Sequence, residues 1–487
     1  MSRRHTIALV AAVVAGAGVL ALPTPASLAP AGHATLAVLA MAVVLWVTEA
    51  VSYATSAVLV TTALAIAVGL GPRTAEAGAP LYGTGKALAL ALGGFTTPAV
   101  VLVGGALFLS AAMRATGLER RLALLLLSRI GTSRERLLLG VVCTCAALTF
   151  VVPSTTARAA AMVPIVAGVV AACGLSPTSQ LAAQLMMTVA HASSIWNVAV
   201  KTGAAQNLVA VGLFEKSLGV TLTWGAWLRE GLPWALVMSA MLVITMRRLV
   251  PTEDVDEAQV GAAMARDRSA AGPMRGNERR LAWLAAVLLA AWITEGWLHP
   301  VDSATAMLIA LGAMLLPRVG VLAWDEAERL VPWGTLLLFG VGVGLGSALV
   351  ETGAARWVAD TTLARLGFAQ WTPLAMIAGL GLLNLAVHQG FASAASLASA
   401  ILPVFLAFFT ALDRPEAPAL GMTLVQQFLV SVGFLLPVNS PQNMVAYGSG
   451  AFTTRAFLRT GIPLTIAAMV VTLVLAATWW RWTGLLP

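Results

Sequence analysis

The chain has 487 residues, of which 59% are hydrophobic and 10% are charged, and its formal net charge is +8. A mean hydropathy of +0.88 is too high for a soluble domain of this length and indicates a polytopic membrane protein. In such a protein, positive charge is typical of arginine-rich cytoplasmic loops, so nucleic-acid binding is not expected. The three cysteines, Cys143, Cys145 and Cys173, lie in apolar segments and predict neither a disulfide framework nor a metal site.

The first apolar run follows two arginines and is interpreted as a retained signal anchor. Runs long enough to cross a bilayer then recur along the chain. The eleven candidate spans are 6–22, 33–49, 51–70, 97–113, 178–200, 224–246, 281–298, 303–317, 333–350, 420–436 and 460–479. Two further apolar stretches, 138–173 and 370–410, are broken midway by polar residues. Each could be one poor span or a re-entrant hairpin.

The distribution of arginines favours the hairpin interpretation. With eleven spans and two hairpins, all arginine clusters fall on one side of the membrane, and the connection 22–32, which lacks Lys and Arg, falls on the other. We therefore predict a multi-pass inner-membrane protein with a cytoplasmic N-terminus and an external C-terminus. Residues 247–280 form a cytoplasmic linker, and the mixed charges and small residues of 251–280 predict that it is flexible.

The two halves of the chain resemble each other. Matching positions are Thr116-Gly117 with Thr352-Gly353, Ser154 and Pro164 with Ser393 and Pro403, and Ala205-Gln206-Asn207 with Pro441-Gln442-Asn443. An odd number of spans separates the copies, so they face the membrane in opposite senses. This is the inverted-repeat pattern of secondary transporters.

Each half has two polar interruptions, at the hairpin tips 153–158 and 388–396 and at the helix breaks 201–207 and 437–443. Backbone leaves the helical pattern at membrane depth only where protein or a water-filled cavity satisfies it. A serine at the start of a helix also leaves backbone N–H groups available to an anion. Four breaks in symmetric positions thus predict one central site, although hydroxyls and kinks of this kind also serve only to pack helices.

Three segments carry a resemblance to a known family: WVTEAVSYATSAVLV (46–60), GGALFLSAAMRATGLERRLAL (104–124) and LLPVNSPQNMVAYGSGAFTTRAFLRTGIPL (435–464). On these segments the chain resembles the divalent anion:sodium symporter (INDY-like) family of dicarboxylate, citrate and sulfate carriers. The resemblance implies an all-α fold of about eleven transmembrane helices plus two re-entrant hairpins. It also implies a homodimer in which a transport domain moves past a scaffold domain as an elevator.

The repeat and the resemblance together divide the chain. The expected parts are scaffold spans 1–95, a first repeat 96–220, scaffold spans 221–330 with the linker 247–280, a second repeat 331–455, and a last span 456–487. The first repeat contains hairpin 138–173 and the break near 201–207, and the second contains hairpin 370–410 and the break near 437–443.

The chain departs from the family at the tips. Family members carry Ser-Asn-Thr at each tip, where those side chains hold substrate carboxylate and border two sodium sites. Here the tips are Ser154-Thr155-Thr156 and Ser393-Ala394-Ala395, so both asparagines are missing. The family's sodium-binding hydroxyl before each tip is replaced by Phe150 and Gln389. These changes weaken a sodium-coupled assignment.

Two cations lie where the family has neutral residues. An unpaired Arg or Lys at mid-bilayer costs about 2.5 to 3.5 kcal/mol on insertion scales, so it usually faces a cavity and a partner. The sequence offers no acid opposite Arg158 or Lys201, and an anionic substrate is the natural counter-charge. The alternatives are snorkelling to the interface or hydrogen bonds to backbone carbonyls. Our hypothesis is that both residues replace the charge of sodium.

The candidate residues follow from these arguments. Substrate-binding candidates are Ser154, Thr155, Thr156, Arg158, Lys201, Asn207, Ser393, Asn439, Ser440 and Asn443, and coupling candidates are His191, Asn197, His388 and Gln389. No catalytic residue, cofactor or metal site is expected, and sodium is kept as an alternative. The expected partners are a small anion, the lipid bilayer and a second copy of the chain.

We therefore predict a secondary transporter of a di- or tricarboxylate or of sulfate, independent of sodium and working by exchange or proton coupling. The alternatives are a sodium-coupled dicarboxylate symporter, an inorganic-ion permease and a non-transporting membrane sensor. An enzyme is not expected, because the chain lacks H-E-x-x-H, G-x-S-x-G and paired membrane aspartates.

Overall fold

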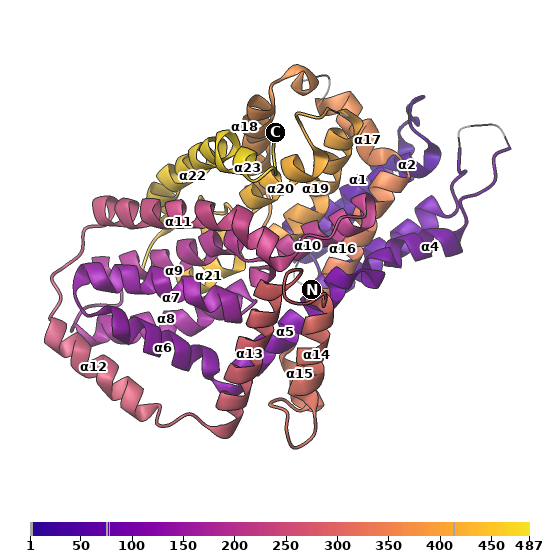
Figure 1. Ribbon diagram of the computed structural model, residues 1–487. Coiled ribbons are helices and arrows are strands. Elements are labelled where there is room, and N and C mark those ends of the chain that lie inside the picture. The colour runs from indigo at the N-terminus through magenta and orange to yellow at the C-terminus, as the bar shows by residue number, and fades with distance from the viewer. Residues whose placement is uncertain (1–2, 75, 77, 364, 366, 413) are drawn as a thin grey trace.

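The protein is an all-α membrane protein (Figure 1). A computed structural model describes residues 3–74, 76, 78–363, 365, 367–412 and 414–487. Among these residues, seven helices are long and apolar enough to cross a membrane, and shorter apolar helices accompany them. The long ones include α8 (Thr155–Ala172) and α19 (Ala394–Leu412), which are the second arms of the two hairpins.

The first half of the chain begins with helices that carry no hairpin. They are α1 (Arg3–Ala21), α2 (Pro30–Thr48), α3 (Tyr53–Ala63), η1 (Leu64–Val68), α4 (Thr84–Leu92), η2 (Gly93–Thr96), α5 (Pro98–Thr116) and α6 (Leu118–Ile130). The first hairpin and broken helix follow as α7 (Arg134–Val151), α8, α9 (Gln180–Ala199), η3 (Lys201–Gly203) and α10 (Ala205–Leu218). Helices α11 (Trp224–Leu249) and α12 (Glu257–Ala270) lead to the second half.

The second half also has a hairpin and a broken helix after a series of other helices. It begins with α13 (Gly276–Thr294), α14 (Ser303–Leu315), α15 (Trp324–Leu330), α16 (Trp333–Glu351), α17 (Ala354–Val358), η4 (Ala359–Leu363) and η5 (Phe368–Gln370). The second hairpin and broken helix are α18 (Pro373–His388), α19, α20 (Ala419–Val430), η6 (Pro437–Asn439) and α21 (Pro441–Tyr447). The chain ends with α22 (Thr454–Ala477) and α23 (Trp479–Trp482).

Polar residues at the helix starts explain where many of these helices begin. The hydroxyls of Ser133, Ser179, Thr223 and Thr453 each accept a hydrogen bond from a backbone N–H in the first turn of the following helix. The broken stretches 138–173 and 370–410 fold as the helix pairs α7–α8 and α18–α19, with the chain reversing at each polar tip.

Two elements differ from the sequence-based expectation. Residues 257–270 of the expected flexible linker form α12, because Val260 and Met264 are buried where this helix packs against α6 and α8 (Figure 1). The helix predicted over 420–436 ends at Val430, and residues 431–436 leave the helical pattern ahead of Pro437.

The same backbone geometry recurs in the two halves. Gly117 and Gly353 end equivalent helices with φ of 73° and 72°. At the two helix breaks, Ala204 has φ −155° and ψ 150°, and Ser440 has φ −154° and ψ 141°. Both pairs are 236 residues apart in the sequence.

Glycines set the distance between each broken helix and the helix packed beside it. A Cβ atom at Gly231 of α11 would lie 2.3 Å from the carbonyl oxygen of Val198, and one at Gly461 of α22 would lie 1.9 Å from that of Phe434. Each carbonyl lies just ahead of a break, so a larger residue would push the break away from its supporting helix.

We expect Gly461→Ala to lower the thermal stability of the purified protein markedly, because the backbone of residue 434 cannot rotate away as a side chain could. Fluorescence-detected thermal unfolding in detergent measures the effect. Gly312→Ala is the matched control: this exposed glycine of α14 has no heavy atom within 4 Å of a built Cβ. Equal melting temperatures for both variants would contradict the packing argument.

Candidate functional site

A cavity of about 340 Å³ lies where the two hairpin tips meet the two helix breaks. The tips contribute Ser154, Thr155, Thr156, Ser393, Ala394 and Ala395, and the breaks contribute Ala205, Gln206, Ser440, Pro441 and Gln442. The rest of the lining includes Tyr53, Leu107, Ser110, Arg114, Pro332, Thr335 and Leu338. Segments almost 400 residues apart in the sequence are thus joined in one site.

The tips bring the starts of α8 and α19 to the cavity. The Ser154 hydroxyl accepts a hydrogen bond from the Ala157 N–H at 3.3 Å, and the Ser393 hydroxyl accepts one from the Ser396 N–H at 3.5 Å. Each serine therefore caps its helix, and the positive ends of both helix dipoles lie at the cavity. An anion is the ligand that such an arrangement favours.

Two glutamines in the cavity lining each form a hydrogen bond to the other half of the chain. The side-chain amide of Gln206, in the first break, donates to the Ser431 hydroxyl of the second half at 3.3 Å. The amide of Gln442, in the second break, donates to the Ser194 hydroxyl of the first half at 2.8 Å. Both glutamines line the cavity, so these bonds fix two wall residues and join the halves.

Arg158 lies behind the first tip and is fully buried. One terminal nitrogen, Nη1, donates to the carbonyl oxygens of Val152 (2.7 Å) and Gly203 (2.9 Å). The other, Nη2, donates to Asn197 Oδ1 at 2.6 Å and makes longer contacts of 3.4 Å to the Ser193 carbonyl and the Thr155 hydroxyl. The guanidinium thus ties the tip to the first break, and it is absent from the cavity lining.

In the second half, neutral side chains make a comparable connection. The amide of Asn439 donates to the carbonyl oxygens of His388 at 3.0 Å and Phe391 at 3.4 Å. The imidazole Nε2 of His388 lies 3.3 Å from the carbonyl oxygen of Asn439. Both residues are fully buried, so the second tip is tied to the second break without a cation.

Asn207 and Asn443 support the breaks themselves. Asn207 donates to the carbonyl oxygens of Asn197 at 2.7 Å and Val200 at 2.9 Å, and Asn443 donates to that of Gly433 at 2.8 Å. In both halves one bond therefore reaches back ten residues to a carbonyl that the helix break leaves open. Neither asparagine lines the cavity.

Lys201 is also buried away from the cavity. Its ammonium donates to the Leu222 carbonyl oxygen at 2.5 Å. The carboxylates of Glu215, Glu295 and Asp302 act on it electrostatically. Sequence reasoning did not find these acids: Glu215 lies on the next helix, α10, and Glu295 and Asp302 come from a distant part of the chain.

The coupling candidates are spread over both halves. Asn197 lines the cavity and accepts from Thr155 and Arg158. His191 is stacked on Phe457, and His191 and His388 are both fully buried, with no hydrogen-bond partner for either Nδ1 atom among the described residues. Gln389 donates to the Leu385 carbonyl one turn earlier. Of these four residues, the cavity includes Asn197 alone.

Sequence reasoning missed Arg114, Tyr53 and the two glutamines. Arg114, at the end of α5, lines the cavity and donates through Nη2 to the Leu330 carbonyl at 2.6 Å. From the sequence, it counts only among the arginines that mark one side of the membrane. The glutamines carried a usable signal, since each precedes a repeated asparagine in Gln206-Asn207 and Gln442-Asn443.

Comparison with known proteins places these features in a family context. The family model for the sodium:sulfate symporter transmembrane region matches residues 3–486. A membrane protein of Cupriavidus necator is 46% identical over 98% of this chain and 92% of its own length. The sodium-dependent dicarboxylate transporter SdcS of Staphylococcus saprophyticus is 24% identical (93% and 87% covered), and the L-tartrate/succinate antiporter of Escherichia coli is 25% identical (81% of each).

The fold also matches a solved structure. The crystal structure of the YdaH transporter of Alcanivorax borkumensis superposes with a TM-score of 0.57 at 15% identity, covering 92% of this chain and all of that one. At this level of identity, the match concerns the fold alone.

Glu119 makes stability depend on pH next to the site. It lies in the first turn of α6, which is not among the candidate spans, and burial raises the pKa of its carboxyl to about 7 although Arg114 opposes the shift. The folded protein therefore holds a proton that the unfolded chain releases near pH 4.5, and stability falls as the pH rises from 4.5 to 7.

We expect Glu119→Gln to match the wild-type melting temperature near pH 5 and to exceed it at pH 8, because glutamine mimics the protonated acid. Glu135→Gln is the control: this carboxylate is partly exposed and its pKa is lowered, mainly by a backbone hydrogen bond, so it stays charged over the same range. A difference between wild type and Glu119→Gln that did not change with pH would contradict the assignment.

Proposed function

The chain belongs to the sodium:sulfate symporter family, and we propose that it is a secondary active transporter of a small di- or tricarboxylate or of sulfate that works without a sodium gradient. It is a multi-pass membrane protein of a transporter family and not an enzyme. The observation that carries the proposal is the cavity at the meeting point of both hairpin tips and both helix breaks.

The chemistry of the cavity favours an anion. Arg114 contributes a cation to the lining, and the starts of α8 and α19 contribute partial positive charge. Hydroxyls of Ser154, Thr155 and Ser440 add neutral hydrogen-bonding groups. No Asp or Glu side chain occurs in the described lining, so nothing there repels a carboxylate or a sulfate.

The contacts of Arg158 support independence from sodium. Backbone oxygens of Val152 and Gly203, together with Asn197 Oδ1, form the kind of oxygen cluster that would suit a small cation, and the guanidinium already occupies it. A sodium ion added there would be repelled by a permanent positive charge. At the second tip, the carbonyls of His388 and Phe391 are bonded to Asn439. The arrangement at the first tip therefore does not fit sodium.

Coupling without sodium leaves exchange or proton coupling. One relative is an L-tartrate/succinate antiporter, which agrees with exchange. Another is a sodium-dependent dicarboxylate transporter, so sodium coupling is the alternative to be tested. His191 and His388 remain the proposed proton carriers, because a buried imidazole can gain or lose a proton when its surroundings change.

We also infer that the two halves form an inverted repeat and that the carrier moves as an elevator within a homodimer. The recurring break geometry, the paired glycines and the crossed Gln206 and Gln442 bonds support the repeat. The elevator, the dimer and a cytoplasmic N-terminus rest on the family resemblance and on the distribution of arginines.

Sodium independence can be tested in proteoliposomes. We expect the rate of uptake or exchange of labelled succinate, tartrate or sulfate to change by no more than about twofold when sodium is replaced by potassium or choline. The reason is that the guanidinium of Arg158 occupies the oxygen cluster at the first tip. Empty vesicles serve as the control. Strict dependence on sodium would establish the sodium-coupled symporter instead.

Arg114→Gln should raise the apparent KM for the anion by about tenfold or more, because a charge-assisted hydrogen bond contributes about 1.5 to 3 kcal/mol. Arg114→Lys should retain part of the affinity. Arg120→Gln, which removes an exposed charge of α6 outside the lining, is the matched control. An unchanged KM in Arg114→Gln protein of normal thermal stability would remove this residue from the site.

A further inference from the structure

A second cavity, of about 620 Å³, lies away from the central site. It is bounded by the start of α9, the end of α11 and the start of α22. Arg455 and Arg459 line it together with the hydroxyl residues Thr178 and Thr453, and its wall includes the apolar side chains of Leu249 and Phe452. The described lining contains no Asp or Glu.

The two arginines are positioned to act together. They are four residues apart on α22 and therefore share one face of the helix. Both are exposed, and neither has a hydrogen bond or ion pair with any other residue that the structure describes. The first backbone N–H groups of α22 add partial positive charge at the same end. The cavity thus presents two uncompensated cations.

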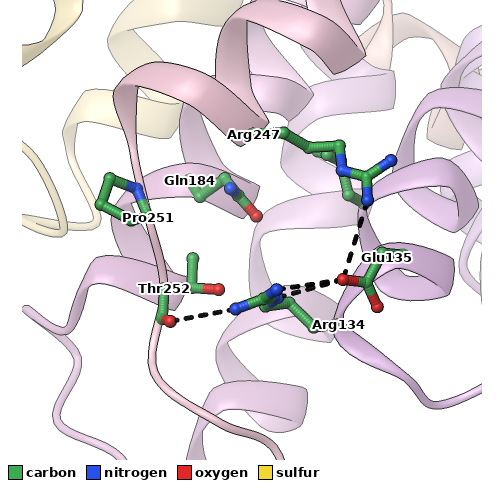
Figure 2. A pocket seen from close by; sticks show the side chains of 7 residues that line it. Arg134, Glu135, Gln184, Arg247, Pro251 and Thr252 are labelled. Atoms are coloured by element: carbon green, nitrogen blue, oxygen red, sulfur yellow. Dashed lines mark hydrogen bonds and ion pairs between the residues drawn. The ribbon is translucent and has the colours of Figure 1, made fainter.

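A neighbouring cavity shows what a compensated site looks like. Figure 2 shows Arg134 and Arg247 around a hollow of about 120 Å³, with Glu135 lying between them. Glu135 Oε1 is 3.1 Å from Arg134 Nη2 and 3.9 Å from Arg247 Nη2. A carboxylate of this chain already balances part of that charge, which is not so for Arg455 and Arg459.

Glu253, an acid on the segment that follows α11, serves another helix. Glu253 accepts hydrogen bonds from the backbone N–H groups of Gln180 and Leu181, both at 2.9 Å, and so caps α9. Its charge serves the dipole of α9 and leaves the arginines of α22 free.

The position relative to the membrane limits the ligand. Residues Thr454–Trp482 form a candidate span, so the arginines in its first turns lie at a membrane surface. The cavity combines two guanidinium groups, which suit the planar, paired recognition of phosphate oxygens, with an apolar wall. We propose that it binds a phosphate group, carried by an anionic phospholipid at this surface or by a small soluble phosphate ester.

Occupation would brace three helices. Residues of α9, α11 and α22 contribute to the lining. One of them, Thr460, has its hydroxyl 3.5 Å from His191 Nε2. A ligand bound to the folded protein and not to the unfolded chain raises its melting temperature. This proposal does not depend on the transported substrate.

The test compares purified wild type with the double variant Arg455→Gln, Arg459→Gln. Thermal unfolding is measured in neutral lipid nanodiscs, in nanodiscs containing phosphatidylglycerol, and in neutral nanodiscs with added glycerol phosphate. We expect wild type to gain several degrees in the second or third condition and the variant to gain little. A gain in the second condition alone identifies the lipid as the source, and a gain in the third identifies a soluble ester.

The matched control is Arg266→Gln, Arg268→Gln on α12, which removes the same charge from exposed positions outside this cavity. This control should keep the wild-type gain. An equal gain in the Arg455 and Arg459 variant would assign the effect to general surface charge and overturn the proposal. No gain for wild type in either phosphate condition would also overturn it.

Discussion

Open backbone at membrane depth is the constraint on which this structure depends. Carbonyl groups released by a hairpin tip or a helix break have no water to bind in the hydrocarbon layer, so the protein must supply donors. Arg158 and Asn439 meet this need at the two tips, and Asn207 and Asn443 meet it at the two breaks. These residues fix the backbone of the site and do not line it.

The residues that satisfy the open backbone do not line the cavity, so other side chains form its wall. Arg158 and Lys201 are bonded to backbone carbonyls, and the cation in the described cavity lining is Arg114. The side-chain hydrogen bonds of Gln206 and Gln442 join the two halves of the chain beside the cavity. Arg158 and Lys201 thus hold the fold, whereas Arg114 both lines the cavity and donates to the Leu330 carbonyl oxygen. Elsewhere, Glu135 is paired with Arg134, whereas the described lining around Arg455 contains no acid.

The sequence alone was enough for the fold class. Hydropathy predicted a polytopic α-helical protein. The polar interruptions left each broken stretch open as one poor span or a hairpin, and the distribution of arginines favoured the hairpin. Local patterning could not predict α12, since Val260 and Met264 are apolar positions in an otherwise polar segment, and only contact with α6 and α8 explains their burial.

For the site, the sequence by itself determined the segments that meet, through the repeat and the tips that carry Ser154 and Ser393. The tertiary structure decided the direction in which each side chain points. A guanidinium on a long side chain can reach a cavity or a carbonyl from the same position, and the sequence contains no distance to distinguish them. Packing turned Arg158 toward the carbonyl oxygens of Val152 and Gly203 and away from the cavity, whereas Arg114 contacts the Leu330 carbonyl oxygen and still lines the cavity.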